Sequence, residues 1–123
     1  MPNDCWNNIT IVTRNSDELN NFINEEIKDH HLAVFTKRSR NGAIINIWSP
    51  NTLPRDWLIR LLDSYPNCWI KNEWKEEAGM AGVWVGYVNE NNQKVIKEFY
   101  WRDLSVDEEH FFFLDNNNIV RRN

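Results

Sequence analysis

The chain has little glycine, proline or cysteine, and it has no long apolar run. Only four of its 123 residues are glycine, four are proline and two are cysteine. No apolar stretch approaches the roughly 18 residues that a membrane-spanning helix requires, and no apolar segment typical of a secretion signal follows Met1. Cys5 and Cys68 lie far apart in the sequence. We therefore expect reduced thiols in a cytoplasmic protein that does not associate with membranes.

A basic excess is also lacking. The chain has 14 Lys and Arg against 18 Asp and Glu, with a net charge of -4 and a pI near 5.3. Binding to phosphate groups usually needs a local positive field, so this composition disfavours a nucleic-acid partner, although a basic patch on one face stays compatible with it. The basic runs at 37–40 and 121–122 are short, which is typical of solvated loops and tails.

Aromatic residues, in contrast, are plentiful. Seven Trp and six Phe contribute to a 13% aromatic and 41% hydrophobic composition, enough to bury a core. Domains most often contain about 100 to 150 residues, and the sequence shows no internal repeat or proline-rich linker. We predict one domain over 1–123, with its core at about 5–101 and a short helix and tail at 104–123.

The first half of the chain predicts a strand, a helix and a hairpin. Residues 6–13 alternate between polar and apolar side chains, as in a half-buried strand. Asn15 or Ser16 is suited to cap a helix whose apolar residues recur at helical spacing. Residues 32–37 and 43–48 are rich in β-forming residues and are joined by a polar loop, which predicts antiparallel pairing.

The second half predicts a further helix, three strands and a terminal helix. The helix begins near Thr52 and Pro54 and ends at Tyr65, with an apolar stripe along one side. The later elements are strands over 68–75, 82–89 and 94–101 and a short helix over 105–114. The order β-α-β-β-α-β is typical of a ferredoxin-like fold. We thus predict an α+β fold with helices on one face of an antiparallel sheet, which a C-terminal β-meander extends.

Four short segments of the chain resemble motifs of a known family. They are Met1-Pro2-Asn3-x-Cys5-x-Asn7, Trp48-Ser49-Pro50, Tyr65-Pro66 and Glu76-Glu77-Ala78-Gly79-Met80-Ala81-Gly82. In order and spacing they resemble the YubB-like ferredoxin-like family of phages, conjugative plasmids and viruses. Asp4 stands where that family usually has Trp, and Asn51 replaces its second Pro. The resemblance implies a ferredoxin-like fold and a viral or mobile-element setting, but no catalytic residue, because the family's activity is unassigned.

Cysteine and histidine are the first candidates for chemistry. Cys5 with His30 or His31 as base would be a nucleophile pair, whereas a buried core thiol and histidines at a helix C-terminus are the structural alternative. Metal binding needs a compact set of ligands. The two cysteines and three histidines show no CxxC or HxxxH spacing; they are Cys5, Cys68, His30, His31 and His110. We therefore expect no metal and no cofactor.

A carboxylate cluster is the second candidate. Glu73, Glu76 and Glu77 lie where a predicted strand runs into a turn. They are suited to acid and base catalysis or to cation binding. Charges at such a position more often face water and discourage edge pairing, so we favour a surface role for them.

Aromatic strand residues are the most informative candidates. Strand alternation places Trp69, Trp84 and Tyr100 on one face and Trp74, Val83, Val85 and Trp101 on the other. A sheet with helices on one side leaves its other side uncovered, and an apolar surface of that kind marks an interface. The alternative is that Phe111, Phe112 and Phe113 fold back over it. We predict a binding surface made of Trp69, Trp74, Trp84, Tyr100, Trp101, Glu76 and Glu77.

These observations favour a non-enzymatic accessory protein of a virus or mobile element that acts by protein–protein interaction or self-association. Replacing Trp74 or Trp84 with Ala should then impair association without unfolding the domain. The alternative is a module that binds single-stranded nucleic acid on the sheet, although the chain lacks the Lys/Arg-Gly-Phe/Tyr strand motif of RNA-recognition modules. A small enzyme of unknown reaction is the third hypothesis.

Overall fold

The computed structural model describes residues 3–27 and 33–101. In these residues a strand, a helix, two strands and a second helix are followed by three consecutive strands. The elements are β1 (Asp4–Thr13), α1 (Ser16–Phe22), η1 (Ile23–Ile27), β2 (Val34–Arg38), β3 (Gly42–Pro50), α2 (Arg55–Ser64), β4 (Cys68–Glu76), β5 (Ala81–Val88) and β6 (Lys94–Tyr100).

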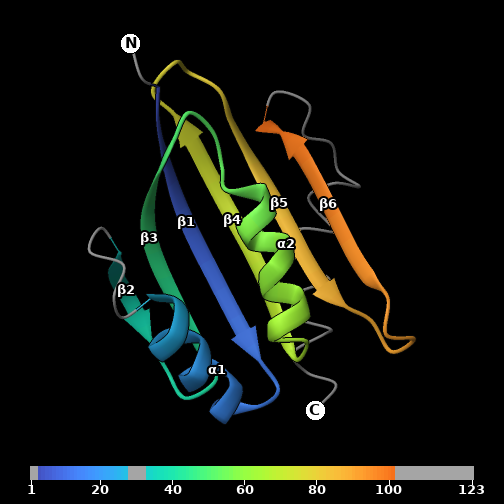
Figure 1. Ribbon diagram of the computed structural model, residues 1–123. Coiled ribbons are helices and arrows are strands. Elements are labelled where there is room, and N and C mark those ends of the chain that lie inside the picture. Colours follow the sequence, from blue (N-terminus) through green and yellow to red (C-terminus); the bar gives the residue numbers. More distant parts are fainter. Residues whose placement is uncertain (1–2, 28–32, 102–123) are drawn as a thin grey trace.

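The strands form one antiparallel sheet in the order β2-β3-β1-β4-β5-β6. Figure 1 shows α1 and α2 side by side over one face of this sheet, with β2 and β6 at its two edges. In the centre, Ile9 of β1 pairs with Ile45 of β3 and with Asn72 of β4. The predicted α+β fold with an antiparallel sheet and two packed helices is confirmed.

The first helix begins as its sequence predicts and then widens. Asn15 is the N-cap, and its side-chain oxygen accepts hydrogen bonds from the backbone of Asp17 and Glu18. The α-helical turns end at Phe22, and the π-helical segment η1 carries the chain on to Ile27. Because a π-helix places residues five apart on one face, Phe22 and Ile27 are both buried.

The second helix is held by its apolar stripe. Pro54 precedes it without a side-chain capping bond, and Leu58, Leu61 and Leu62 are fully buried against the sheet. The helix ends at Ser64, before the predicted stop at Tyr65 and Pro66. The prediction of an amphipathic helix in this segment is confirmed.

Each face of the sheet carries a separate apolar cluster. The larger cluster lies between the helices and the sheet and includes Trp74 and Trp84. Glycine makes room for it: a Cβ on Gly86 would lie 2.4 Å from the ring of Trp84 and 2.9 Å from Leu62. The smaller cluster lies on the opposite face, called here the helix-free face because no helix of residues 3–27 and 33–101 covers it, and contains Trp69, Val83, Val85 and Phe99.

Several predictions fall on residues that the structure does not describe. The expected C-terminal helix over 105–114, with Phe111, Phe112 and Phe113, lies outside the described residues. His30, His31 and His110 lie outside them as well. Within the described ranges, no helix combines the length and the apolar character needed to cross a membrane.

Candidate functional site

The tryptophans of the predicted binding surface are mostly buried. Only 3% of Trp69, 2% of Trp74 and 1% of Trp84 is exposed. Trp74 and Trp84 share the helix-covered face and belong to its core, whereas Trp69 lies on the opposite face. The expectation that these three side chains form an accessible surface is therefore wrong, as is the pairing of Trp69 with Trp84 on one face. A buried Trp contributes 150–250 Å² of apolar area, so their primary role is structural.

Tyr100 and Trp101 are the aromatic residues of the predicted surface that remain accessible. Their exposed fractions are 38% and 49%. The Tyr100 ring meets Trp74 edge to face at 5.9 Å on the helix side, while Trp101 stacks on Phe99 with ring centroids 6.3 Å apart. Ile96 on β6 is 39% exposed. The end of the outer strand β6 is thus an aromatic corner of the sheet.

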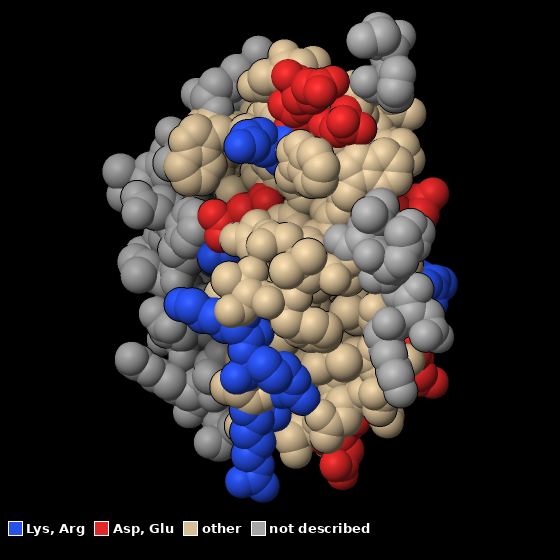
Figure 2. All heavy atoms as spheres, turned by 90° about the vertical axis from the view of Figure 1, so that its left-hand side faces the viewer, with Lys and Arg blue, Asp and Glu red and all other residues tan. Residues whose placement is uncertain are grey.

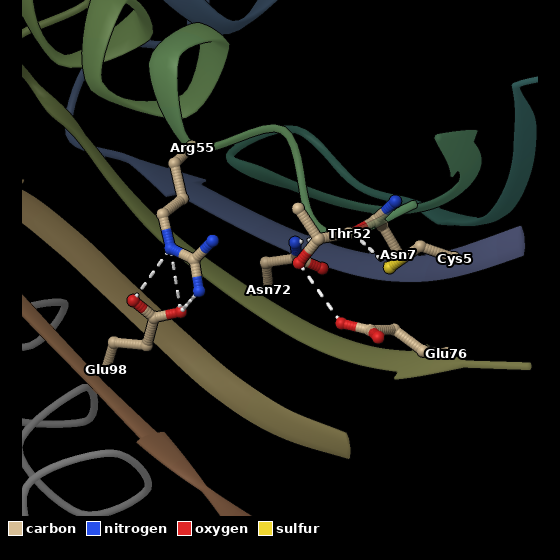
Figure 3. Close-up of polar contacts among 7 residues, drawn as sticks. All are labelled: Cys5, Asn7, Thr52, Arg55, Asn72, Glu76 and Glu98. Atoms are coloured by element: carbon tan, nitrogen blue, oxygen red, sulfur yellow. Dashed lines mark hydrogen bonds and ion pairs between the residues drawn. The ribbon is translucent and has the colours of Figure 1, made fainter. Parts of the chain in front are cut away.

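Glu76 is the last residue of β4 and Glu77 begins the turn that follows, and the Glu76 side chain connects two other segments. Its carboxylate accepts hydrogen bonds from Asn3 Nδ2 at 2.9 Å and from Thr52 Oγ1 at 3.1 Å, the second of which Figure 3 shows. Glu77 is exposed, and its backbone N–H donates to the carbonyl of Asp4. The carboxylate of Glu76 therefore joins the start of β1 to the segment before α2, and a binding role for either residue stays a prediction.

A buried polar network lies beneath the start of α2. Asn7 Nδ2 donates to Ser49 Oγ at 2.8 Å and to the carbonyl of Ile47 at 3.1 Å, and Asn72 Nδ2 donates to Asn7 Oδ1 at 2.8 Å. Figure 3 shows Asn7 and Asn72 close to the Cys5 thiol, which lies 3.8 Å from Asn7 Oδ1. Within the described residues, Asn72 Oδ1 is buried without a hydrogen-bond partner.

An ion pair joins the first turn of α2 to β6. Arg55 Nε lies 3.0 Å from both carboxylate oxygens of Glu98, and Figure 3 shows this paired contact. The hydrogen bond that Arg55 donates to Glu98 raises the pKa of Arg55. Both side chains are partly exposed, at 39% and 28%. Solvent therefore screens the pair, and its contribution to stability is small.

The two thiols are poorly suited to nucleophilic chemistry. Cys5 and Cys68 are buried and unpaired with one another. Burial is the largest cause that raises the pKa of Cys5, and burial raises the pKa of Cys68 to about 12. A cysteine–histidine pair stays a prediction, because both candidate bases lie outside the described residues. Over residues 3–27 and 33–101, no group of His, Cys, Asp or Glu is placed to hold a metal ion.

Sequence reasoning missed a second aromatic site on the helix-free face. Trp6 of β1 and Trp48 of β3 are cross-strand partners, and Lys75 of β4 lies on the other side of Trp6. Trp6 is 52% exposed, and Trp48 is anchored by a hydrogen bond from Nε1 to Asp4 Oδ1 at 2.9 Å. In the structure Trp6 alternates with the buried Cys5 and Asn7, but the pairing of Trp6 with Trp48 is visible only in the sheet register.

Two surface hollows follow this site along β1 and β3. The first, of about 360 Å³, lies at the tryptophan pair and is lined by Trp6, Asn8, Val34, Asn46, Trp48 and Lys75 among others. The second, of about 550 Å³, lies further along the same strands and includes Lys37 and Arg38 in its lining. Figure 2 shows a group of Lys and Arg toward the lower end of the β2 side, while Asp and Glu lie at the upper end beside a further Lys or Arg and are scattered elsewhere on this side.

Comparisons with known proteins assign this chain to no family. The scan against protein-family models, the search of curated proteins and the search of solved structures each returned no match. The resemblance to the YubB-like family stays a prediction, and the geometry of the chain itself must carry any functional proposal.

Proposed function

We propose that this chain is a non-enzymatic accessory protein of a virus, phage or plasmid that associates with a protein partner or a second copy of itself. The contact surface is the aromatic corner at the end of β6. The exposed Trp101 carries the proposal: it stacks on Phe99 at the end of an outer strand, and 49% of its surface is accessible. The viral or mobile-element setting rests on the resemblance to the YubB-like family.

A ferredoxin-like fold is part of the same proposal. The strand order β2-β3-β1-β4 supports it, since α1 follows β1, α2 follows β3 and each pair of neighbouring strands is antiparallel. β5 and β6 then add to the β4 edge as consecutive antiparallel strands, which supports the proposed C-terminal meander. This extension is what brings Trp101 to the sheet edge.

The chemistry of the corner suits a protein interface. Tyr and Trp are enriched at such interfaces and among the residues that dominate binding energy. Tyr100 lies on the helix side of β6 and Trp101 on the helix-free side, so a partner that meets the strand end contacts both rings. Arg55 and Glu98 hold β6 to α2 nearby, which limits the reorganisation that binding would otherwise require.

Sedimentation velocity over a concentration series tests self-association. We expect Trp101→Ala to lower the self-association of the chain, while the matched variant Trp6→Ala, which removes another half-exposed Trp, leaves it unchanged. A photo-crosslinking residue at position 101 or at position 6 tests the protein partner in the native host. Wild-type chain that stays monomeric and crosslinks no more at 101 than at 6 would overturn the proposal.

A further inference from the structure

We infer that the helix-free face over β3, β1 and β4 binds single-stranded nucleic acid, with Trp6 and Trp48 as its base-stacking platform. This goes beyond the proposed function, because the site lies on other strands than the aromatic corner of β6. It needs neither Tyr100 nor Trp101.

The position of the two rings is the first support. Trp6 and Trp48 lie directly opposite one another on neighbouring central strands of the sheet, on the face that the two helices leave uncovered. Single-stranded nucleic acid is held on such faces by bases that stack on aromatic side chains. The hydrogen bond from Trp48 to Asp4 fixes one ring, and the exposure of Trp6 leaves the other ring accessible to a base.

The polar residues beside the rings are the second support. Asn8 and Asn46 are the next cross-strand pair on the same face, and Thr10 follows at the start of the second hollow. Amide and hydroxyl groups both donate and accept hydrogen bonds, as the edges of unpaired bases require. Asn46 Nδ2 is already oriented by a hydrogen bond to Thr36 Oγ1 at 2.9 Å.

The charge along this track is the third support. Lys75 flanks Trp6 at one end, and Lys37 lines the second hollow at the other. Between them Lys71 lies 3.2 Å from Glu73, so these two charges offset each other, and Asp4 adds one negative charge beside Trp48. A phosphate backbone responds to the local field, so the net charge of the whole chain does not decide binding here.

The length of the track and its shape favour a single strand over a duplex. From Trp6 to Val12 the strand β1 spans about 20 Å at ~3.4 Å per residue, enough for a short single-stranded site of about four nucleotides. Paired bases in a duplex are stacked on one another and cannot lie flat on a ring. The geometry therefore selects unpaired bases.

Fluorescence anisotropy with labelled oligothymidylate, oligouridylate and a duplex of the same length tests this inference. We expect the wild-type chain to bind the single strands more tightly than the duplex, with an affinity that falls between about 50 and 200 mM salt. Trp6→Ala should weaken binding about tenfold, as loss of one stacked base predicts, and Lys37→Ala should reduce the salt slope by about one. Trp101→Ala should bind as the wild type does.

Circular dichroism and thermal melting show whether each variant folds, and Trp6→Thr, which keeps a strand-forming residue, replaces Trp6→Ala if the latter does not fold. No binding of either single strand at low salt would overturn the inference, as would equal binding of the duplex or equal loss in Trp6→Ala and Trp101→Ala. If Trp6 contacts a protein partner instead of nucleic acid, neither single strand binds at low salt, and the inference is overturned. Self-association through Trp101 is measured separately, so each proposal can fail alone.

Discussion

Asn72 of β4 donates a hydrogen bond from Nδ2 to Oδ1 of Asn7 on β1, at 2.8 Å and wholly inside the protein. Asn7 in turn reaches Ser49 on β3, so one buried amide pair connects the three central strands. This network lies on the helix-covered face of the sheet. The same strands, β1 and β3, carry Trp6 and Trp48 on their opposite face. The network supports the register of these strands.

The buried amides should be energetically coupled. Asn7→Leu or Asn72→Leu alone leaves a buried polar group without its partner and should lower the free energy of unfolding by about 1–3 kcal/mol. The double variant should lose less than the sum, with a coupling of at least about 0.5 kcal/mol. Urea unfolding of the four proteins measures this, and strictly additive losses would contradict the role of the pair.

Gly86 should be intolerant of any side chain. Its added Cβ would lie 2.4 Å from the Trp84 ring, which is fully buried, so Gly86→Ala should cost about 1–3 kcal/mol of stability through overpacking. Gly42→Ala is the matched control, because its closest neighbour would lie at 3.4 Å. Thermal melting of the two variants should separate them clearly. If Gly86→Ala melts at the same temperature as Gly42→Ala, Trp84 is loosely packed and the prediction is wrong.

Glu26 should make the fold sensitive to acid. The hydrogen bond from Arg60 is the largest cause that lowers the pKa of Glu26 below its ordinary 4.5, and Trp57 and Tyr65 add to it. A carboxyl with a lowered folded pKa stabilises the protein above its unfolded pKa, and this contribution is lost as pH falls through the folded value. Because Arg60 is exposed, solvent screens the pair and the contribution is small.

Glu26→Gln therefore removes that pH dependence. Urea unfolding from neutral pH down to below 4.5 should show a shallower loss of stability in the variant than in the wild type. Glu25→Gln, at the neighbouring position, controls for the general loss of one negative charge. If Glu26→Gln and the wild type lose the same stability as the pH falls, the role given to Glu26 is wrong.

Both thiols should react slowly in the native protein. Cys68 is buried and its pKa is about 12, so its thiolate population near neutral pH is very small. Alkylation by iodoacetamide should be slow for Cys5 and Cys68 alike and should become fast when urea unfolds the chain. Rapid labelling of Cys5 in the folded protein would point instead to an activated nucleophile.

Local patterns predicted the elements of the fold well but not how the strands align. Alternation within each strand was interpreted correctly: Trp69 and Trp74 face opposite sides of β4, and Trp84 faces away from its neighbours Val83 and Val85. Which side of one strand matches which side of the next depends on cross-strand register, which alternation alone does not determine. In the structure Asn72 pairs with Trp84, so Trp74 shares a face with Trp84 and Trp69 does not.

The accessible aromatic site was hidden for a related reason. Trp6 was assigned to a strand, but only the pairing of β1 with β3 shows that it lies opposite Trp48, more than forty positions away by their numbers. The widening of α1 into η1 was also outside the reach of helical periodicity, which assumes one constant spacing. Sequence patterns thus predicted that the sheet was aromatic, while register decides which rings a partner can touch.

The central claim is that Trp6 and Trp101 are accessible while Trp69, Trp74 and Trp84 are buried. Tryptophan-selective chemical modification of the native chain, mapped by mass spectrometry of its peptides, tests this most directly. We predict fast modification of Trp6 and Trp101 and protection of the other three, and added single-stranded oligonucleotide should protect Trp6 but not Trp101. Modification of Trp84 as fast as that of Trp6, or protection of Trp6 in the chain without any partner, would contradict the account.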